Sequence, residues 1–399
     1  MTSRIVFIVE STFQKWEHQR FGIDLLRSNR FEVEIWDLTP FMHPGCEKQN
    51  ENLKEVKDPG YHLFRTRDEA FAAIAGLDNA SFVVCMVVYS RKALPLYRAL
   101  SKSQAAYGVV YVYGQPETKQ PPEIFIRKLL RNASPAIVAQ RFFRAVPFKT
   151  WGIRPAATLV LAGTTSMPAF RYPVDATTRI LWGHSFDYDV YLNELQRPSE
   201  APAAPTAVFL DECIPNHPDY AQIGIPAPCR DEEYYPPLGR FFDWVEKNHG
   251  LKVVIAAHPR SDYGESRPFG NRPVVKGKTA ELVRTCQCVM SHASTSVNFA
   301  VLFNKPLVFL TLSALENVPR EKNRIHSMAG WFKKAPLLID AIAAITEKDW
   351  RSSLALDRAA YERYRETFIK SAGSPEKPQW QLFADFLLAG AAPRGRFEP

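Results

Sequence analysis

The stretch "CVMSHASTSVNFAVLFNKPLVFLT", residues 288–311, holds the order of elements that decides the fold. It begins with an apolar run that is typical of a buried strand, passes through small polar residues and continues as an amphipathic helical segment. A second apolar run closes the stretch at 306–311. A strand, a helix and another strand with short connections predict two parallel strands and their crossover helix.

The same alternation occurs on both sides of this stretch. Upstream apolar runs are "AVFLDE" (207–212) and "LKVVIAAHP" (251–259), and the first half contains "RIVFIVE" (4–10) and "FEVEIWDL" (31–38). A segment rich in Pro and Ala, 199–206, separates the two series and has no hydrophobic periodicity. Such a segment is typical of a linker.

The chain has 399 residues, which is more than one hydrophobic core usually holds. We therefore predict an α/β protein with two doubly wound parallel-sheet (Rossmann-like) domains that face a cleft. The predicted parts are an acceptor-side domain at 1–198, the linker at 199–206, a donor domain at 207–345, and C-terminal helices at 346–399 that pack back across the domains.

The charge balance favours an anionic partner. The chain has 50 Lys and Arg against 42 Asp and Glu, a net charge of +8. This suits a phosphorylated substrate or an anionic surface. Nucleic acid is not expected, because the basic residues are scattered and no nucleic-acid-binding module is present.

One segment, 121–155, combines Arg and Lys with interleaved aromatic and aliphatic residues. It predicts peripheral contact with the inner face of the plasma membrane or with a phosphorylated acceptor. A packed helical pair whose charges face water is the alternative. No run approaches the roughly 18 apolar residues of a membrane span, so we expect a cytoplasmic protein.

Polar residues follow two of the predicted strands where ligands of doubly wound sheets bind. His258, Pro259 and Arg260 follow one strand, and the run Ser291–Ser296 follows another. Hydroxyl groups at the start of a helix favour phosphate, although a Ser or Thr there is also a good N-cap. His258 is suited to donate a hydrogen bond to a leaving phosphate, and Pro259 stiffens its loop.

The segments "IAAHPR" and "LVRTCQCVMSHASTSVNFAVLFNKPLVFLT" resemble the His-Pro and Ser-Ser/Thr motifs of bacterial GT-B glycosyltransferases. The likeness is to the group that uses CMP-activated acid sugars, the sialyl-, polysialyl- and Kdo-transferases, and it covers about 207–311. It implies a GT-B fold with closing C-terminal helices and an inverting, metal-independent transfer.

In that group the His and the hydroxyl groups hold the nucleotide phosphate, which implies the same role for His258 and for three hydroxyl residues. These are Ser294, Thr295 and Ser296. Further donor-binding candidates, by their place in the sequence, are Pro259, Arg260, Ser291, Glu212 and Lys278. No cofactor is expected, since protein donors neutralise the leaving group.

Enzymes of this group also carry an acidic pair followed by Gly, whose first acid deprotonates the acceptor hydroxyl. Here the pair is Asp211 and Glu212, but Cys213 replaces the Gly, and the pair begins the second domain instead of belonging to the first. Glu10, at the end of the first strand, is the rival base. Asp187 and Asp189 mimic a metal-binding Asp-x-Asp, although Asp187 is also placed to cap a helix.

The resemblance implies a bacterial transferase in capsule or lipopolysaccharide synthesis. Its donor would be a nucleotide sugar, CMP-linked Kdo or another nonulosonic acid, and its acceptor a surface polysaccharide or a lipid-linked glycan. Three alternatives stay open: a CDP-polyol phosphotransferase, a sugar-nucleotide 2-epimerase, and a non-catalytic nucleotide- or glycan-binding partner of a polysaccharide synthesis complex.

Overall fold

The structure is a computed structural model that describes residues 2–11, 13, 15–44, 58–116, 142–143, 145–164, 172–198, 203–217, 220, 225–263 and 267–389. The chain divides into two units. Unit 1 comprises Met1–Gly114, Gln120–Phe186 and Lys370–Pro399, and unit 2 comprises Gln115–Lys119 and Asp187–Ile369. Residues 187–198, predicted from the sequence to belong to the first domain, fall in unit 2.

Unit 1 contains a seven-stranded parallel sheet within the described residues, in the order β3-β2-β1-β4-β5-β6-β7. Its strands are β1 (Arg4–Val9), β2 (Glu32–Asp37), β3 (Tyr61–Leu63), β4 (Ser81–Cys85), β5 (Ala106–Tyr111), β6 (Thr158–Ala162) and β7 (Arg179–Gly183). Its helices include α1 (Lys15–Arg20), α2 (Ile23–Ser28), α3 (Thr39–Met42), α4 (Arg67–Ala75), α5 (Leu94–Lys102) and α17 (Gln379–Leu388).

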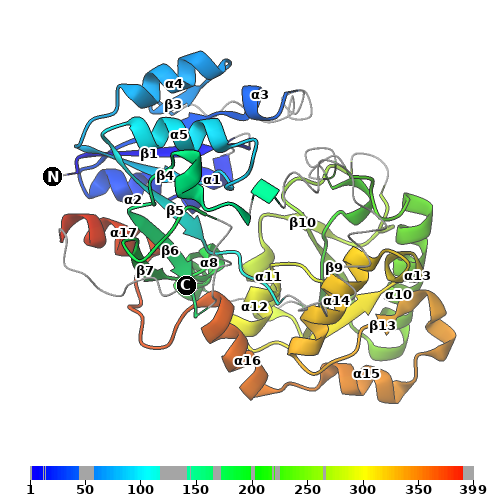
Figure 1. Cartoon of the computed structure of the whole chain (residues 1–399). Helices are drawn as coiled ribbons and strands as arrows, with labels where there is room; N and C mark the ends of the chain where they lie inside the picture. Colours follow the sequence, from blue (N-terminus) through cyan, green and yellow to red (C-terminus); the bar gives the residue numbers. More distant parts are fainter. Residues whose placement is uncertain are drawn as a thin grey trace. The chain divides into compact units, whose positions relative to one another are not determined.

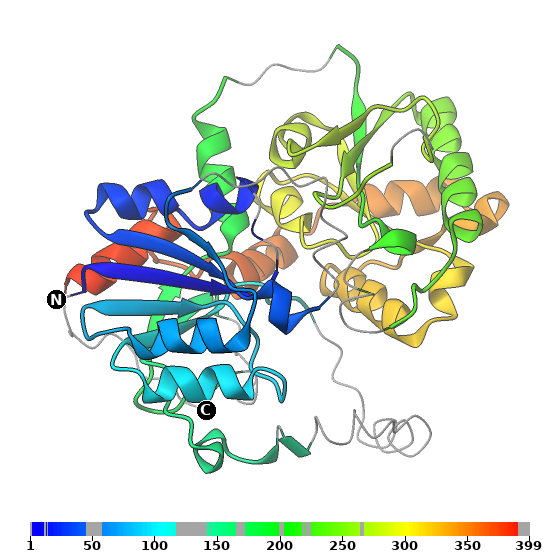
Figure 2. The same ribbon diagram turned by 90° about the horizontal axis from the view of Figure 1, so that it is seen from above.

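Helices cover both faces of this sheet, because its central strands are apolar on both sides. In β1, Val6 and Ile8 pack with α4 and α5, whereas Ile5, Phe7 and Val9 pack with α2 and α17. Figure 2 shows α4 and α5 on one face and α2 and α17 on the other. The continuous apolar runs that predicted buried parallel strands are thus explained.

Among the described residues, unit 2 contains a six-stranded parallel sheet in the order β10-β9-β8-β11-β12-β13. Its strands are β8 (Thr206–Leu210), β9 (Lys252–Ala257), β10 (Val274–Lys276), β11 (Cys288–Ser291), β12 (Leu307–Thr311) and β13 (Leu337–Leu338). Its helices include α8 (Phe186–Leu195), α10 (Asp231–His249), α11 (Thr279–Thr285), α12 (Val297–Leu302), α13 (Ser313–Glu316), α14 (Pro319–Trp331), α15 (Glu347–Leu354) and α16 (Arg358–Tyr364).

The C-terminal part of the chain is divided between the two units. Helices α15 and α16 contribute Trp350, Tyr361 and Tyr364 to the core of unit 2. Helix α17 instead lies against α2 and β7 of unit 1 (Figure 1). There the indole of Trp380 packs edge-on against Phe7 with ring centroids 4.9 Å apart. The chain thus ends in the unit where it began.

Both sheets have the strand order of Rossmann-like folds, in which the chain leaves the first strand in one direction and later returns to its other side. The reversal lies between β1 and β4 in unit 1 and between β8 and β11 in unit 2. Loops diverge at such a switch point and leave room for a ligand beyond the carboxyl ends of the strands. Each unit therefore has one such edge.

Candidate functional site

The carboxyl end of β8 is the centre of the candidate site in unit 2. Asp211 and Glu212 follow β8 directly, and β8 lies between β9 and β11. His258 follows β9, and the hydroxyl run Ser291–Ser296 begins at the end of β11. Since neighbouring strands are about 4.8 Å apart, β9 and β11 are separated by about 10 Å. The structure thus brings the two predicted motifs to one edge.

Asp211 is buried, with 4% of its surface exposed, and it fixes this edge by three hydrogen bonds. Its carboxylate accepts from the backbone N–H of Cys213 at 2.9 Å and of His258 at 3.2 Å, and from the hydroxyl of Tyr263. Burial raises the pKa of Asp211, and the three hydrogen bonds oppose that rise.

The predicted role of Asp211 as the base that takes a proton from an acceptor is not supported by this placement. Both of its oxygens accept hydrogen bonds, and its side chain is almost fully buried. These bonds anchor the loops after β8 and β9, and the role of Asp211 as the base stays a prediction. The left-handed backbone of Cys213, with φ of 49°, is where a Gly would fit with least strain.

Glu212 joins the hydroxyl run to α14. Its Oε1 accepts from the N–H of Ala293 at 2.8 Å, and its Oε2 pairs with Arg324. Arg324 also donates to the carbonyl of Ala293 at 3.0 Å and pairs with Glu321 at 2.9 Å. Both polar groups of the Ala293 backbone are therefore held by one ion-pair network.

The charges of this network stabilise each other. Burial opposes ionisation of Glu212, but the positive charge of Arg324 outweighs it and lowers the pKa of the carboxyl below its usual value. Only 12% of the Glu212 side chain and 3% of the Glu321 side chain are exposed. The sequence predicts that Glu212 binds the donor. In the structure Glu212 binds Arg324 and the backbone N–H of Ala293.

The hydroxyl run folds as a tight turn before α12. Ser291 is fully buried, and its Oγ accepts from the N–H of Ser294 at 3.1 Å. The Oγ of Ser294 in turn accepts from the N–H of Ser296 at 3.2 Å. Ser294 and Ser296 are half-buried and Thr295 is exposed, so part of each of these three residues faces solvent. Helix α12 starts only at Val297, three residues later than the predicted helix.

His292, within the same run, is structural. It is fully buried; its Nδ1 lies 2.8 Å from the carbonyl of Leu310 and its Nε2 lies 3.1 Å from the hydroxyl of Tyr234. Burial lowers the pKa of His292, which favours the neutral ring. The imidazole thus ties β11 to β12 and α10.

His258 is half-buried, and a second histidine contacts it. Its Nε2 lies 3.3 Å from Nε2 of His217, which follows a short 3-10 helix after β8. Its Nδ1 accepts from the N–H of Arg260 at 3.2 Å. Pro259 is exposed and Arg260 is half-buried. Sequence reasoning did not single out His217.

Lys276, the last residue of β10, and Lys278, just after it, lie at the β9–β10 side of the sheet. Lys276 donates from Nζ to the carbonyl of Ser261. Lys278 is exposed and pairs with Glu281 at 3.2 Å on the first turn of α11. Lys278 is therefore already partly neutralised, and its predicted role in donor binding remains a prediction.

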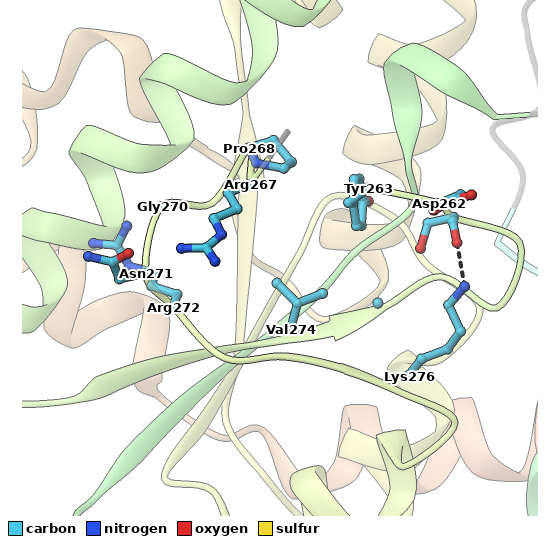
Figure 3. A pocket seen from close by; sticks show the side chains of 11 residues that line it. Asp262, Tyr263, Arg267, Pro268, Gly270, Asn271, Arg272, Val274 and Lys276 are labelled. Atoms are coloured by element: carbon cyan, nitrogen blue, oxygen red, sulfur yellow. Dashed lines mark hydrogen bonds between the residues drawn. The ribbon is translucent and has the colours of Figure 1, made fainter. Parts of the chain in front are cut away.

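A cavity of about 440 Å³ lies beside the loop that follows His258. Figure 3 shows Tyr263, Arg267 and Lys276 around it, and Ala257 at the end of β9 forms part of its wall. Arg272 also lines it, but the guanidinium is paired with Glu246 at 2.7 Å. The cavity offers an aromatic ring, polar groups and cationic side chains to a ligand of monosaccharide or nucleoside size.

The switch point of unit 1 carries a carboxylate–histidine pair. Glu10 follows β1; its Oε1 accepts from the N–H of Val88 at 3.0 Å, and its Oε2 lies 3.1 Å from Nε2 of His43. Lys92 lies 3.4 Å from Nδ1 of His43. Because an ammonium only donates, Nδ1 accepts and Nε2 carries the proton towards Glu10. The predicted rival base is thus a His-bound carboxylate.

The His-Pro dipeptide that pointed to His258 occurs twice more in the sequence. Three of the nine histidines precede a proline, and they are His43, His217 and His258. A residue before proline is restricted to extended conformations, which suits the abrupt end of a strand or of a short helix. The His-Pro dipeptide therefore marks all three.

Two other expectations concern residues that the structure describes only in part. Of the basic segment 121–155, residues 121–141 and 144 lie outside the described residues. Within the remainder, Lys149 pairs with Asp175 at 2.7 Å and Arg154 donates to the carbonyl of Leu100 at 3.0 Å. Among the described residues no helix is both long and apolar enough to cross a bilayer.

Asp187, part of the Asp-x-Asp mimic, lies in the first turn of α8 and accepts from the side-chain amide of Asn298 at 2.8 Å. This bond ties the start of α8 to α12 within unit 2. One carboxylate oxygen of Asp187 is therefore engaged in a contact within the protein.

No family model matches this sequence, and no curated protein matches it significantly in sequence. Solved structures do match in fold. CalG4, the calicheamicin glycosyltransferase, superposes with a TM-score of 0.54 at 13% identity, over 97% of this chain and 98% of that one. The wall teichoic acid polymerase TagF superposes with a TM-score of 0.53 at 9% identity, over 97% of this chain and 89% of that one.

A further structure of TagF, the H444N variant soaked with CDPG, gives a TM-score of 0.50 at 9% identity. Together with two Rossmann-like units of the strand orders described above, these likenesses identify the fold. The predicted fold class is confirmed: the chain has the GT-B fold that glycosyltransferases use.

Proposed function

We propose that this protein is a glycosyltransferase that transfers a sugar from a nucleotide donor to a glycan acceptor, with inversion and without a metal ion. One observation carries the proposal. Asp211 and Glu212, consecutive at the end of β8, bind the backbone of His258 on one side and of Ala293 on the other. They hold the predicted phosphate-binding groups at one switch point of a GT-B fold.

The donor phosphate would lie at this edge. The imidazole of His258 and the hydroxyls of Ser294, Thr295 and Ser296 provide hydrogen-bond donors that neutralise the charge of a departing nucleotide. Because α12 has only six residues, its dipole contributes less to phosphate binding than these side chains and their turn do. The cavity beside the His258 loop has the size and the mixed lining that the nucleoside of the donor requires.

Unit 1 offers a candidate base for the proton of an acceptor hydroxyl, the imidazole of His43. Glu10 fixes the Nε2–H tautomer, as in other carboxylate-oriented histidine bases, so that Nδ1 is the accepting nitrogen. Nδ1 faces Lys92 at 3.4 Å, and an acceptor hydroxyl would have to displace that contact. In the reaction the acceptor oxygen forms a bond to the anomeric carbon and the bond from that carbon to the phosphate oxygen breaks. The electron pair leaves with the phosphate, and the hydroxyl proton goes to Nδ1.

The donor we propose is CMP-linked Kdo or another nonulosonic acid, on the strength of the His-Pro and serine motifs alone. The acceptor would be a surface polysaccharide or a lipid-linked glycan of a bacterial envelope. Peripheral membrane contact through 121–155 remains a prediction about residues that lie mostly outside the described part of the chain.

A second candidate is a polyol-phosphate transferase. It is favoured by the fold likeness to the wall teichoic acid polymerase and by a phosphate-binding edge that would serve a CDP-linked donor equally well. The two candidates differ in product, since one forms a glycosidic bond and the other a phosphodiester.

The test has two steps. Thermal shift with CMP, CDP, UDP and GDP identifies the nucleotide, since a ligand that binds only the folded protein raises its melting temperature. Transfer from the matching donors to envelope glycans is then measured for the wild type and for His258→Ala and Ser294→Ala, with product NMR to assign the new bond. We expect each variant to lose about tenfold or more, because each removes a hydrogen bond to a charged group.

Matched substitutions at exposed sites of the same unit serve as controls. These are His326→Ala on α14 and Ser352→Ala on α15, and both should transfer at the wild-type rate. If His258→Ala and Ser294→Ala also retain full activity with every donor, the proposal is wrong. Conversion of UDP-GlcNAc without an acceptor would instead identify the epimerase alternative.

A further inference from the structure

We propose that His217 is the proton partner of His258, and that the two imidazoles bind the donor phosphate together, with His217 taking up a proton as the nucleotide binds. The inference rests on the proposed function and adds to it a residue that no motif assigns. It is carried by the contact between the two rings and by the bond that fixes the tautomer of one of them.

The contact between the rings is direct. The two Nε2 atoms are 3.3 Å apart, and the ring centroids are 4.6 Å apart at an interplanar angle of 60°. The rings come from different strand ends, 41 residues apart in sequence. Asp211 holds the two loops that carry these histidines. Its carboxylate accepts from the N–H of His258 and from the N–H of Cys213, where the chain turns towards His217.

The tautomers follow from the surrounding hydrogen bonds. Nδ1 of His258 accepts from the N–H of Arg260 at 3.2 Å, so a neutral His258 carries its proton on Nε2. That proton points to Nε2 of His217, which must therefore accept, and the proton of a neutral His217 is on Nδ1. The pair holds one proton between its facing nitrogens.

A second proton between the facing nitrogens would be unfavourable without a ligand. It would place two N–H groups against each other at 3.3 Å. An oxyanion changes this balance, because it accepts from both N–H groups and supplies the opposite charge. Binding of phosphate beside the pair should therefore draw one proton from solvent onto Nε2 of His217, and no covalent bond changes in this step.

This proton also serves the reaction. When the bond between the sugar and the phosphate oxygen breaks, the electron pair remains on that oxygen and its negative charge increases. Two N–H donors then face the leaving group where the neutral pair offers one. In other nucleotide-dependent transferases a metal ion stabilises the charge of the leaving oxygen. Here the two N–H donors would stabilise it.

Several other charged or titratable groups surround the pair. After β8 these are Asp211 and Cys213, and after β9 they are Arg260 and Tyr263. The ring centroid of Tyr220 is 5.9 Å from that of His217. The Glu212–Arg324–Glu321 network extends to α14. The ordinary pKa values of these groups lie outside the range from pH 5 to 8, whereas that of an imidazole lies within it. The pH dependence of binding in that range should therefore report the histidines.

The test is calorimetric titration of the full-length protein with CMP, repeated in buffers of different ionisation enthalpy to count protons. Measurements between pH 7 and 8.5 keep the phosphate of CMP dianionic, since its second pKa is about 6. We expect the wild type to take up a measurable fraction of one proton per CMP. The affinity should then fall with rising pH by up to about tenfold per unit.

His217→Gln separates the proton from the hydrogen bond. Its amide reaches the position of Nε2 but cannot take up a proton, so proton uptake and pH dependence should disappear while much of the affinity at pH 8.5 remains. His217→Asn is too short to reach His258 and should lose affinity at every pH. His326→Gln, which removes an exposed histidine of α14, should behave as the wild type.

The outcomes are distinct. Binding of CMP without proton uptake, or with the same uptake in His217→Gln, overturns this inference and leaves the proposed function standing. Failure of the wild type to bind CMP, CDP, UDP or GDP overturns both. Circular dichroism and melting curves of each variant confirm that a loss of binding is not a loss of folding.

Discussion

Arg324→Met should destabilise unit 2 more than any other single charge removal at the site. The substitution keeps an apolar stem of similar length on α14 but leaves Glu212 buried without this cation, whereas Glu321 keeps its pairing with Arg320 at 3.6 Å. Breaking a buried ion pair from one side costs about 3–5 kcal/mol. The two carboxylates here are 12% and 3% exposed in their side chains, so solvent does little to reduce that cost.

Urea denaturation gives the measurement. With an m-value of about 2 kcal/mol per molar, a loss of about 4 kcal/mol lowers the midpoint by about 2 M. Arg351→Met is the matched control. Arg351 pairs with Glu347 at 2.8 Å on α15, but the two side chains are 77% and 54% exposed, and such pairs contribute about 0–1 kcal/mol.

The pH dependence gives a second, independent check. In the wild type the pKa of Glu212 is lowered, so its stabilising contribution is present above the unfolded pKa near 4.3 and is lost as the pH falls through the folded value. In Arg324→Met the carboxylate of Glu212 is buried without the guanidinium, so its protonation stabilises the folded state. The difference in unfolding free energy between wild type and variant should therefore shrink from pH 7.5 to pH 5.

The reasoning about this network would be refuted by either of two results. One is a loss below about 1 kcal/mol at pH 7.5, which would mean that the carboxylates are solvated after all. The other is a loss that stays constant between pH 7.5 and pH 5, which would mean that packing and not charge carries the effect. Glu212→Gln should be milder, since the amide oxygen still accepts from the N–H of Ala293.

Three further predictions concern other parts of the chain. Glu10→Gln should lower kcat by about 100-fold with little change in KM for the donor, because it disturbs the tautomer of His43 and not the phosphate-binding edge; steady-state kinetics checks this. Gly183→Ala should destabilise unit 1 by about 1–3 kcal/mol in urea denaturation, since its Cβ would overlap the buried amide of Gln379. Burial lowers the pKa of Lys334 to about 8, so the native state binds fewer protons than the unfolded state from about pH 8 to 10; stability relative to Lys334→Met, measured by urea denaturation, should rise over that range.

Elements with a continuous apolar signal could be predicted from the sequence, and their ends could not. The run "SFVVCMVVYS" (81–90) predicts one strand, but β4 ends at Cys85. The helix predicted from Ser294 begins at Val297, because the side chains of Ser291 and Ser294 accept from the backbone and form a turn first. Such local bonds compete with a helix and leave no trace in hydrophobic periodicity.

The partners of the site residues were beyond sequence reasoning for a different reason. Glu10 and His43 are 33 residues apart, and Glu212 and Arg324 are 112 apart. Their contacts depend on where loops return after whole crossover units. A pattern along the chain identifies a strand end, but it does not say which loop from a neighbouring strand arrives there.

Both units use a buried aspartate at a strand end for the same structural purpose. Asp37, the last residue of β2 in unit 1, is fully buried and accepts from the N–H groups of Phe13 and Thr39 and from the hydroxyl of Tyr61. Asp211 in unit 2 likewise accepts from two N–H groups and a tyrosine hydroxyl. Such a carboxylate holds loops, and its burial restricts access to it. The carboxylate of Glu10 also accepts from a backbone N–H, that of Val88, but its side chain is 25% exposed and bound to a histidine. The acidic residue that the motif would nominate as the base thus holds loops, and we propose the partly exposed Glu10–His43 pair for the proton transfer.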